Sequence, residues 1–124
     1  MTDVREASAP TSQQARTGPN PTGDFIWYEL MTTDSDGANA FYGSVVGWSF
    51  GESAPEYQGY RMINMSDGGF AGGVMPINAE MQQHGAQPIW LGYLHVEDVD
   101  QKVASIQAAG GKALMGPTDI PNVG

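Results

Sequence analysis

Two stretches of this chain decide its fold, FIWYELMTTDSD at residues 25–36 and IWLGYLHVEDVD at residues 89–100. Each is a run of aromatic and aliphatic residues, which predicts a strand, followed by an acidic segment that can begin a helix. An apolar helical pattern comes next in both copies, and a glycine closes it, at Gly47 and at Gly110. The copies are offset by 63 or 64 residues. We therefore expect two equivalent modules packed face to face, with a ligand site in their shared cleft.

The composition excludes several classes of function. With 124 residues the chain is one domain at most, and 14 acidic against 5 basic residues give a net charge of −9. No cluster of Lys or Arg could neutralise phosphates, so we expect no nucleic-acid partner and no anionic membrane surface. Cysteine is absent, which excludes disulfides, thiolate metal sites and cysteine nucleophiles. Because no apolar run suits a membrane helix or a signal core, we expect a cytoplasmic protein.

The chain divides into a tail and one domain. Residues 1–23 are mostly small or polar, and such a segment buries too little apolar surface to offset the entropy of ordering. We expect a flexible tail over 1–23 and one domain over 24–124. The domain consists of a first module at about 24–78, a connector at 79–88 and a partial second module at 89–124.

The first module is expected to be a strand, a helix and three further strands, and the second an unfinished copy of it. In the first we expect strands at 25–33, 48–50, 60–65 and 70–75, a helix over 36–46 and a hairpin turn at 66–69. In the second we expect a strand at 89–96, a helix over 99–109 and a strand at 112–115, after a helical turn around 80–83. Two more strands of about 5–6 residues each would complete the copy, so we expect the chain to be incomplete.

Several short motifs have the same order as in a known superfamily. They are Phe41-Tyr42 and Val46-Gly47-Trp48 in and after the first helix, the segment 96–100 before the second helix, and Ala109-Gly110-Gly111 after it. Over residues 24–124 the chain resembles the vicinal oxygen chelate superfamily, which includes glyoxalase I, bleomycin-resistance proteins and extradiol dioxygenases. Segments 29–32 and 117–121 are similar to a glyoxalase-like, mycobacterial-antigen-type branch. The resemblance implies an α+β fold in which paired β-α-β-β-β modules form a curved mixed sheet.

The resemblance also implies a divalent metal on the inner face of that sheet, held by His or Gln on first strands and Glu on last strands. This chain departs from that pattern. The first-strand positions hold Trp27 and Leu91, or Trp90 if the register slips by one, and none of these can bind a metal. The strand expected at 70–75 contains neither carboxylate nor imidazole. We therefore expect no metal cofactor, with a divalent metal ion as the alternative.

Glu29 is the candidate catalytic residue. It alternates with Trp27 and Met31, so the three should share one face of the first strand. If this face lines the cavity, Glu29 is partly desolvated and could act as a general acid or base. Alternatively it is a structural carboxylate bonded to an arginine or a backbone amide.

The candidate ligand-binding residues surround Glu29. His95 should lie on the same face as Leu91 and Tyr93, as a metal ligand or proton shuttle or simply as a hydrogen-bonded histidine. Aromatic and thioether side chains could line a cleft for a flat organic ligand, although each of them could also be core. The candidates for that cleft are Trp27, Trp90, Tyr93, Tyr60, Met62, Met75 and Phe70. The ligand-binding set that we predict is Trp27, Met31, Tyr60, Met62, Leu91, Tyr93 and His95.

The leading hypothesis is a superfamily member that binds a small apolar or aromatic metabolite without the usual metal ligands. Whether it is an enzyme stays open, because this fold also carries lyases, dioxygenases and binding proteins. One alternative is a metal-dependent lyase or dioxygenase whose other ligands lie in the missing segment. Another is a non-catalytic module that acts by association, because an exposed sheet edge favours pairing, and a homodimer is the expected state.

Overall fold

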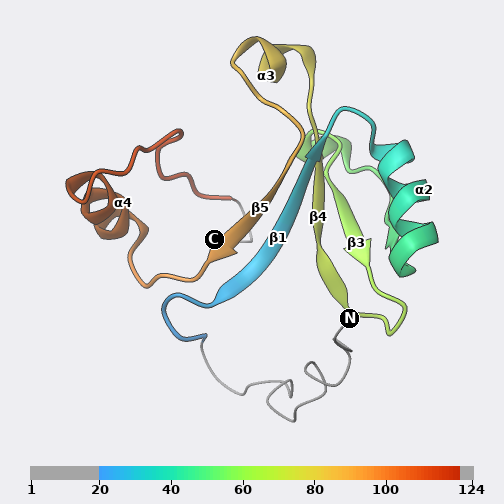
Figure 1. Ribbon diagram of the computed structural model, residues 1–124, viewed down its shortest axis with the longest axis horizontal. Coiled ribbons are helices and arrows are strands. Elements are labelled where there is room, and N and C mark those ends of the chain that lie inside the picture. The colour runs from blue at the N-terminus through green and yellow to red at the C-terminus, as the bar shows by residue number, and fades with distance from the viewer. Residues whose placement is uncertain (1–19, 121–124) are drawn as a thin grey trace, which may run out of the picture.

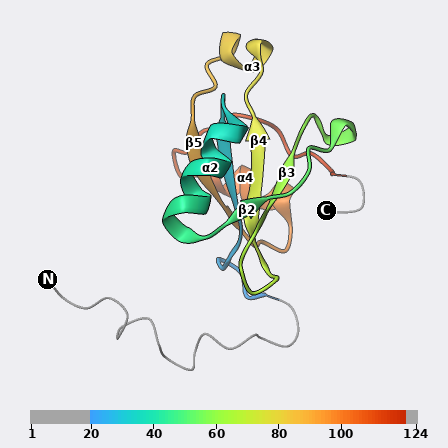
Figure 2. The same cartoon turned by 90° about the vertical axis from the view of Figure 1, so that its right-hand side faces the viewer.

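The computed structural model describes residues 20–120 and confirms an α+β fold with a curved mixed sheet (Figures 1 and 2). Most of the expected tail, residues 1–19, lies outside the described residues, as do residues 121–124. The elements are β1 (Phe25–Thr32), α2 (Ser35–Val46), β2 (Ser49–Phe50), the 3-10 turn η2 (Pro55–Tyr57), β3 (Arg61–Asn64), β4 (Phe70–Pro76), α3 (Ala79–Gln83), β5 (Ile89–Leu94) and α4 (Val99–Ala108).

The five strands form one sheet in the order β2-β3-β4-β1-β5. Strand β1 runs parallel to β4 and antiparallel to β5, and β3 pairs antiparallel with β2 and β4. The predicted hairpin turn joins β3 to β4, where the Met65 N–H donates to the Gly69 carbonyl over 2.8 Å. The predicted first module, a strand and a helix followed by three strands, is therefore confirmed.

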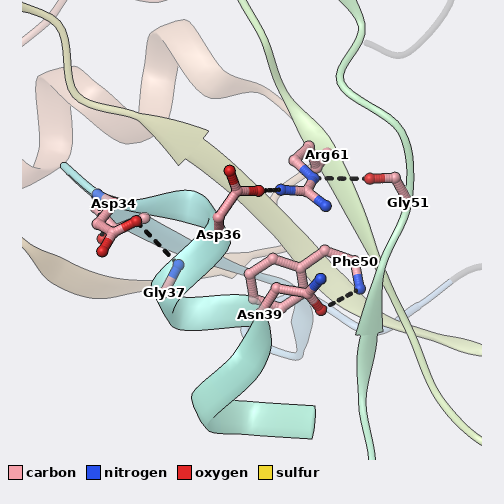
Figure 3. Close-up of polar contacts among 8 residues, drawn as sticks. Asp34, Asp36, Gly37, Asn39, Phe50, Gly51 and Arg61 are labelled. Carbon is pink, nitrogen blue, oxygen red and sulfur yellow. Dashed lines mark hydrogen bonds and ion pairs between the residues drawn. The ribbon is translucent and has the colours of Figure 1, made fainter.

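Helix α2 forms where its local signals predict it. The Asp34 carboxylate caps its first turn by accepting from the Gly37 N–H over 2.9 Å, and Gly47 ends it in the left-handed region with φ 76°. Figure 3 shows how its polar residues reach the strands: Asn39 accepts from the Phe50 N–H over 3.0 Å. Asp36 pairs with Arg61 over 3.0 Å, and Arg61 also donates to the Gly51 carbonyl. These bonds fix α2 against β2 and β3.

The core lies between α2 and the sheet. Its buried members come from four different strands, and Ala38 and Tyr42 of α2 pack against them. Because α2 covers only one face of the sheet, the strands have two unlike faces. Hereafter the α2 face is the one that carries the core, and the inner face is the one opposite. The buried core residues are Leu30, Phe50, Ile63 and Val74.

Strands β1 and β5, the first strands of the two sequence copies, pair with each other. In this antiparallel register Tyr28 lies opposite Gly92, its own equivalent 64 residues later. Trp27 lies opposite Tyr93, and Glu29 lies opposite Leu91. In the other copy, the residues equivalent to Trp27 and Tyr93 are Leu91 and Glu29, so the pair Trp27–Tyr93 is equivalent to the pair Leu91–Glu29. A local two-fold axis through the Tyr28–Gly92 pair therefore relates the first strands of the two copies.

The second copy departs from the prediction after its helix. Residues 112–115 form no strand, so that prediction is wrong, and Leu114 is 88% exposed. A strand needs a neighbour to satisfy its backbone groups, and the described residues after it, 116–120, form no strand either. Figures 1 and 2 show α2 and α4 on opposite sides of the strands. Within residues 20–120 no helix is long and apolar enough to cross a membrane.

Candidate functional site

The inner face brings together most of the side chains predicted to bind a ligand. Residues paired directly across neighbouring strands project from the same face, because side chains alternate along each strand. Glu29 is paired with Leu91 on one side and Gly73 on the other, and Met31 is paired in the same way with Ile89 and Met75. Met62 is also paired with Gly73. The predicted residues that share this face are Trp27, Glu29, Met31, Met62, Leu91 and Tyr93.

Two hydrogen-bonded pairs form the polar centre of this face. Glu29 is buried, with 9% of its surface exposed, and one carboxylate oxygen accepts from the Tyr93 hydroxyl over 3.1 Å. Beside it, the Trp27 indole N–H donates to the Tyr60 hydroxyl over 2.8 Å. These four residues are called the inner-face cluster below. Its acceptor is a buried carboxylate in a largely aromatic setting, where a hydrogen bond is stronger than it would be in water.

A glycine makes the position of Tyr60 possible. A Cβ atom built on Gly73 would overlap the Tyr60 hydroxyl, with 1.8 Å between them. The adjacent Gly72 is needed for another reason, because a Cβ there would lie 1.9 Å from the Tyr28 carbonyl oxygen of β1. The two glycines therefore permit close approach of a side chain on one face and of a strand backbone on the other.

Both tyrosines keep their protons at neutral pH. Burial raises the pKa of Tyr93 to about 12, and the charge of Glu29 adds to the effect. Burial also raises the pKa of Tyr60, against the hydrogen bond from Trp27, which lowers it. Because Tyr60 accepts from Trp27, its own hydroxyl proton can point to another acceptor, and Glu29 lies close enough to raise the Tyr60 pKa by its charge and by hydrogen bonding. The cluster thus consists of one carboxylate and two phenol hydroxyls beside it, of which Tyr93 already donates to Glu29.

The remaining predicted residues are placed differently. His95 follows β5, and its backbone N–H donates to the Asp24 carbonyl over 2.8 Å, while its side-chain Nδ1 is buried without a hydrogen-bond partner in the structure. The predicted aromatic cleft is wrong as a single surface. Trp90 is paired with Leu30, and together with Phe70 it lines a hollow on the α2 face. These two therefore lie on the opposite side of the sheet from Trp27.

That hollow was not foreseen from the sequence. It has a volume of about 550 Å³, and we call it the α2-face hollow. Strand alternation could have placed Tyr28 away from Trp27, and Trp48 on the same face as Phe50 in the strand predicted at 48–50. The residues that line it are Tyr28, Trp48, Met65, Phe70, Ala71 and Trp90.

The described part of the inner face does not fit the divalent metal of the superfamily pattern. Trp27 and Leu91, equivalent about the local two-fold axis, stand at the expected ligand positions and have no donor atom for a metal. Within residues 20–120 no group of three or more His, Cys, Asp or Glu side chains could hold a metal ion. The inner-face cluster supplies one carboxylate alone, where structural and catalytic sites ordinarily use at least three protein ligands.

Comparison with known proteins identifies the family. A family model described as the Glyoxalase/Bleomycin resistance protein/Dioxygenase superfamily matches residues 25–124. "Putative glyoxylase CFP32" of Mycobacterium tuberculosis and of Mycobacterium bovis is 38% identical to this chain over 108 residues, which cover 85% of this chain and 39% of that protein. "Anthracycline biosynthesis protein DnrV" of Streptomyces peucetius is 28% identical over 109 residues, which cover 79% of this chain and 39% of that protein.

The chain therefore spans about two fifths of the length of the curated relatives that it matches. The matched region contains the whole described sheet, both long helices and the inner-face cluster. The motifs, the topology and the family model agree. This chain belongs to the glyoxalase/bleomycin resistance protein/dioxygenase superfamily, the vicinal oxygen chelate superfamily that its sequence resembles.

Proposed function

We propose that this chain binds a small, flat, largely apolar or aromatic metabolite on the inner face of its sheet, without a metal ion. The observation that carries the proposal is the buried Glu29 carboxylate, bonded to Tyr93 and flanked by the Trp27–Tyr60 pair. Aromatic side chains offer large contact areas to a flat molecule at a small loss of conformational entropy. A carboxylate among them selects a ligand that carries a hydroxyl group.

The geometry assigns a role to each member of the cluster. Glu29 uses one oxygen for Tyr93, so its second oxygen is the acceptor for a ligand hydroxyl. The Tyr60 hydroxyl accepts from Trp27 and lies near Glu29, and on binding it would turn its proton to a ligand carbonyl or ether oxygen. Met31, Met62 and Leu91 provide the apolar contact around these two polar groups. A phenol or a hydroxyquinone has this combination of a flat ring with a donor and an acceptor.

The name of one relative is compatible with this class of ligand. DnrV is named as an anthracycline biosynthesis protein. The proposal is restricted to binding, and turnover by Glu29 as a general acid or base would be a further step. That the protein is a cytoplasmic homodimer stays a prediction.

The test is a calorimetric titration of the full chain with 2,6-dihydroxyanthraquinone as the probe, because its hydroxyl groups are not bonded to its own carbonyl oxygens. We expect Glu29→Gln to weaken binding about tenfold or more, because a hydrogen bond to a charged acceptor contributes about 1.5–3 kcal/mol. Glu56→Gln, which changes an exposed carboxylate in η2, is the matched control and should bind as the parent does. Equal affinities for the parent and Glu29→Gln would overturn the proposal. So would elemental analysis that finds a stoichiometric divalent metal whose binding requires Glu29.

A further inference from the structure

A second site is indicated on the other side of the sheet, at the α2-face hollow. Four of its six lining residues are aromatic, and Tyr28, Phe70 and Trp90 are well exposed. Large aromatic side chains that gather around an open hollow, instead of scattering singly, mark an interaction site. None of the lining residues carries a charge, so the recognition must come from the ring faces and from the groups beside the hollow.

The indoles in this hollow are held in place before any ligand arrives. The Trp90 N–H donates to the Tyr42 hydroxyl over 3.0 Å, and their rings meet edge to face at 5.6 Å. The ring centroids of Trp48 and Trp90 lie 6.0 Å apart, with an angle of 67° between the ring planes. Side chains fixed by one another lose little freedom on binding, so the site is preorganised.

The groups around the hollow favour a positive charge. Trp48 directly follows Gly47, which caps α2, and the last turn of α2 has no basic residue. The helix end therefore keeps its partial negative charge beside the hollow. Asp67 lies in the hairpin between Met65 and Phe70, and its carboxylate and the Met65 methyl both lie against Gly69. Arg61, the basic residue of β3, is paired with Asp36 at the opposite end of α2.

We propose that the α2-face hollow binds a small organic cation, of the quaternary ammonium or protonated amine class. Aromatic ring faces attract such cations, because the π-electrons above each ring present negative charge. The negative end of α2 and Asp67 add attraction at short range, and the net charge of −9 adds it at long range. A volume of about 550 Å³ accommodates a trimethylammonium group with room for a larger substituent.

The test uses choline and 3,3-dimethylbutan-1-ol, which have the same shape and differ in charge. The full chain is titrated with each while the three indole N–H signals are followed by NMR, with sodium chloride added to match ionic strength. We expect choline to shift the Trp48 and Trp90 signals and to bind at least fivefold more tightly than the alcohol. The Trp27 signal, which reports the inner face, should not move.

Variants complete the test. Phe70→Leu keeps an apolar side chain but removes a ring, and we expect it to weaken choline binding about fivefold. Asp67→Asn retains the acceptor for the Gly69 N–H and should weaken binding about twofold. Tyr57→Leu removes an exposed ring elsewhere, in η2, and should change nothing. Equal binding of choline and the alcohol, a Trp27 shift as large as that of Trp90, or full affinity in Phe70→Leu would overturn the proposal.

Discussion

Helices α2 and α4 have the same start and stop signals in the sequence, but they pack differently against the sheet. Both begin with an aspartate that accepts from the backbone N–H three residues later, Asp34 from Gly37 and Asp98 from Gln101. Both have an acidic first turn, and a glycine with positive φ follows each of them, Gly47 directly after α2 and Gly110 after the Ala109 cap of α4. Yet α2 lies on a sheet, whereas α4 packs on none of the described strands to a comparable extent.

The two helices differ because the chain takes a different course after each of them. After α2 the chain returns as β2, β3 and β4, and these strands build the surface on which Ala38 and Tyr42 pack. After α4, residues 109–120 form no strand, and Val99 and Ile106 stay about half exposed. Local signals are thus enough to begin and end a helix, but most of its stability comes from packing on the strands of its own module.

The two halves should differ most in how much stability is lost when a large apolar side chain is replaced by alanine. Ile63→Ala removes a fully buried side chain of β3 and should lower the free energy of unfolding by about 2–5 kcal/mol. Ile106→Ala in α4 removes an exposed side chain and should change it by less than about 0.5 kcal/mol. Chemical denaturation of the two variants and the parent measures both values. Similar losses in the two variants would mean that α4 is packed as tightly as α2.

Removing the N-terminal caps of the two helices should affect the global stability in one case and only the local stability of the helix in the other. Replacing Asp34 or Asp98 by alanine removes the same hydrogen bond, worth about 1 kcal/mol to the helix that it begins. We expect Asp34→Ala to lower the global stability by this amount, because α2 unfolds with the core. Asp98→Ala should instead speed amide hydrogen exchange within α4 and leave the denaturation midpoint unchanged. A midpoint shift for Asp98→Ala equal to that for Asp34→Ala would contradict this.

Tyr93 connects the two halves, and its ionisation should weaken that connection. Its pKa in the folded chain is about 12, raised from an ordinary value of 10 by burial and by Glu29. A raised pKa means that the folded state holds this proton more tightly than the unfolded state does. Its contribution to stability is therefore complete below pH 10 and is lost as the pH rises through about 12.

An alkaline titration of tyrosinate absorbance, with and without Tyr93→Phe, measures this ionisation. The parent should show a step near pH 12 that the variant lacks, and Glu29→Gln should move this step to lower pH because it removes the negative charge. A late step that persists in Tyr93→Phe would assign it to another tyrosine and remove the proposed coupling between the halves.

The smallest effect is expected from the ion pair that joins α2 to β3. The Asp36 side chain is 96% exposed, so water and salt screen its contact with Arg61. Asp36→Asn should lower the free energy of unfolding by about 0.5 kcal/mol at low salt and by less at high salt. Asp100→Asn, at the equivalent position in α4, is the control, and it should not lower the free energy of unfolding through the loss of an ion pair.

Local signals in the sequence predicted most of the elements. Aspartates, glycines and alternating apolar residues predicted both helices, the hairpin and the first module within one or two residues, because each signal acts over a few neighbours. The strand at 112–115 failed because a strand depends on a partner elsewhere in the chain. Its apolar residues, Leu114 and Met115, suit a strand but have no neighbour to pair with among residues 20–120.

The candidate site was predicted in part for the same reason. Alternation within β1 places Trp27, Glu29 and Met31 on one face, as expected. The bond between Glu29 and Tyr93 depends on the register of β1 against β5, which no local pattern records. The same register turns Trp90 toward α2, so an aromatic set that looks uniform in the sequence divides between two faces. That these residues bind a ligand stays a prediction.

The bond between Glu29 and Tyr93 also bears on how such a duplicated scaffold can evolve. The two residues occupy equivalent positions 64 apart, one in each copy, and they meet across the local axis. In an early, identical duplicate the same side chain would have met itself there. Two carboxylates would repel each other, and two phenols would lack the charged acceptor. Mutations at one position therefore alter which residues selection tolerates at the other, so the two copies are expected to diverge in concert.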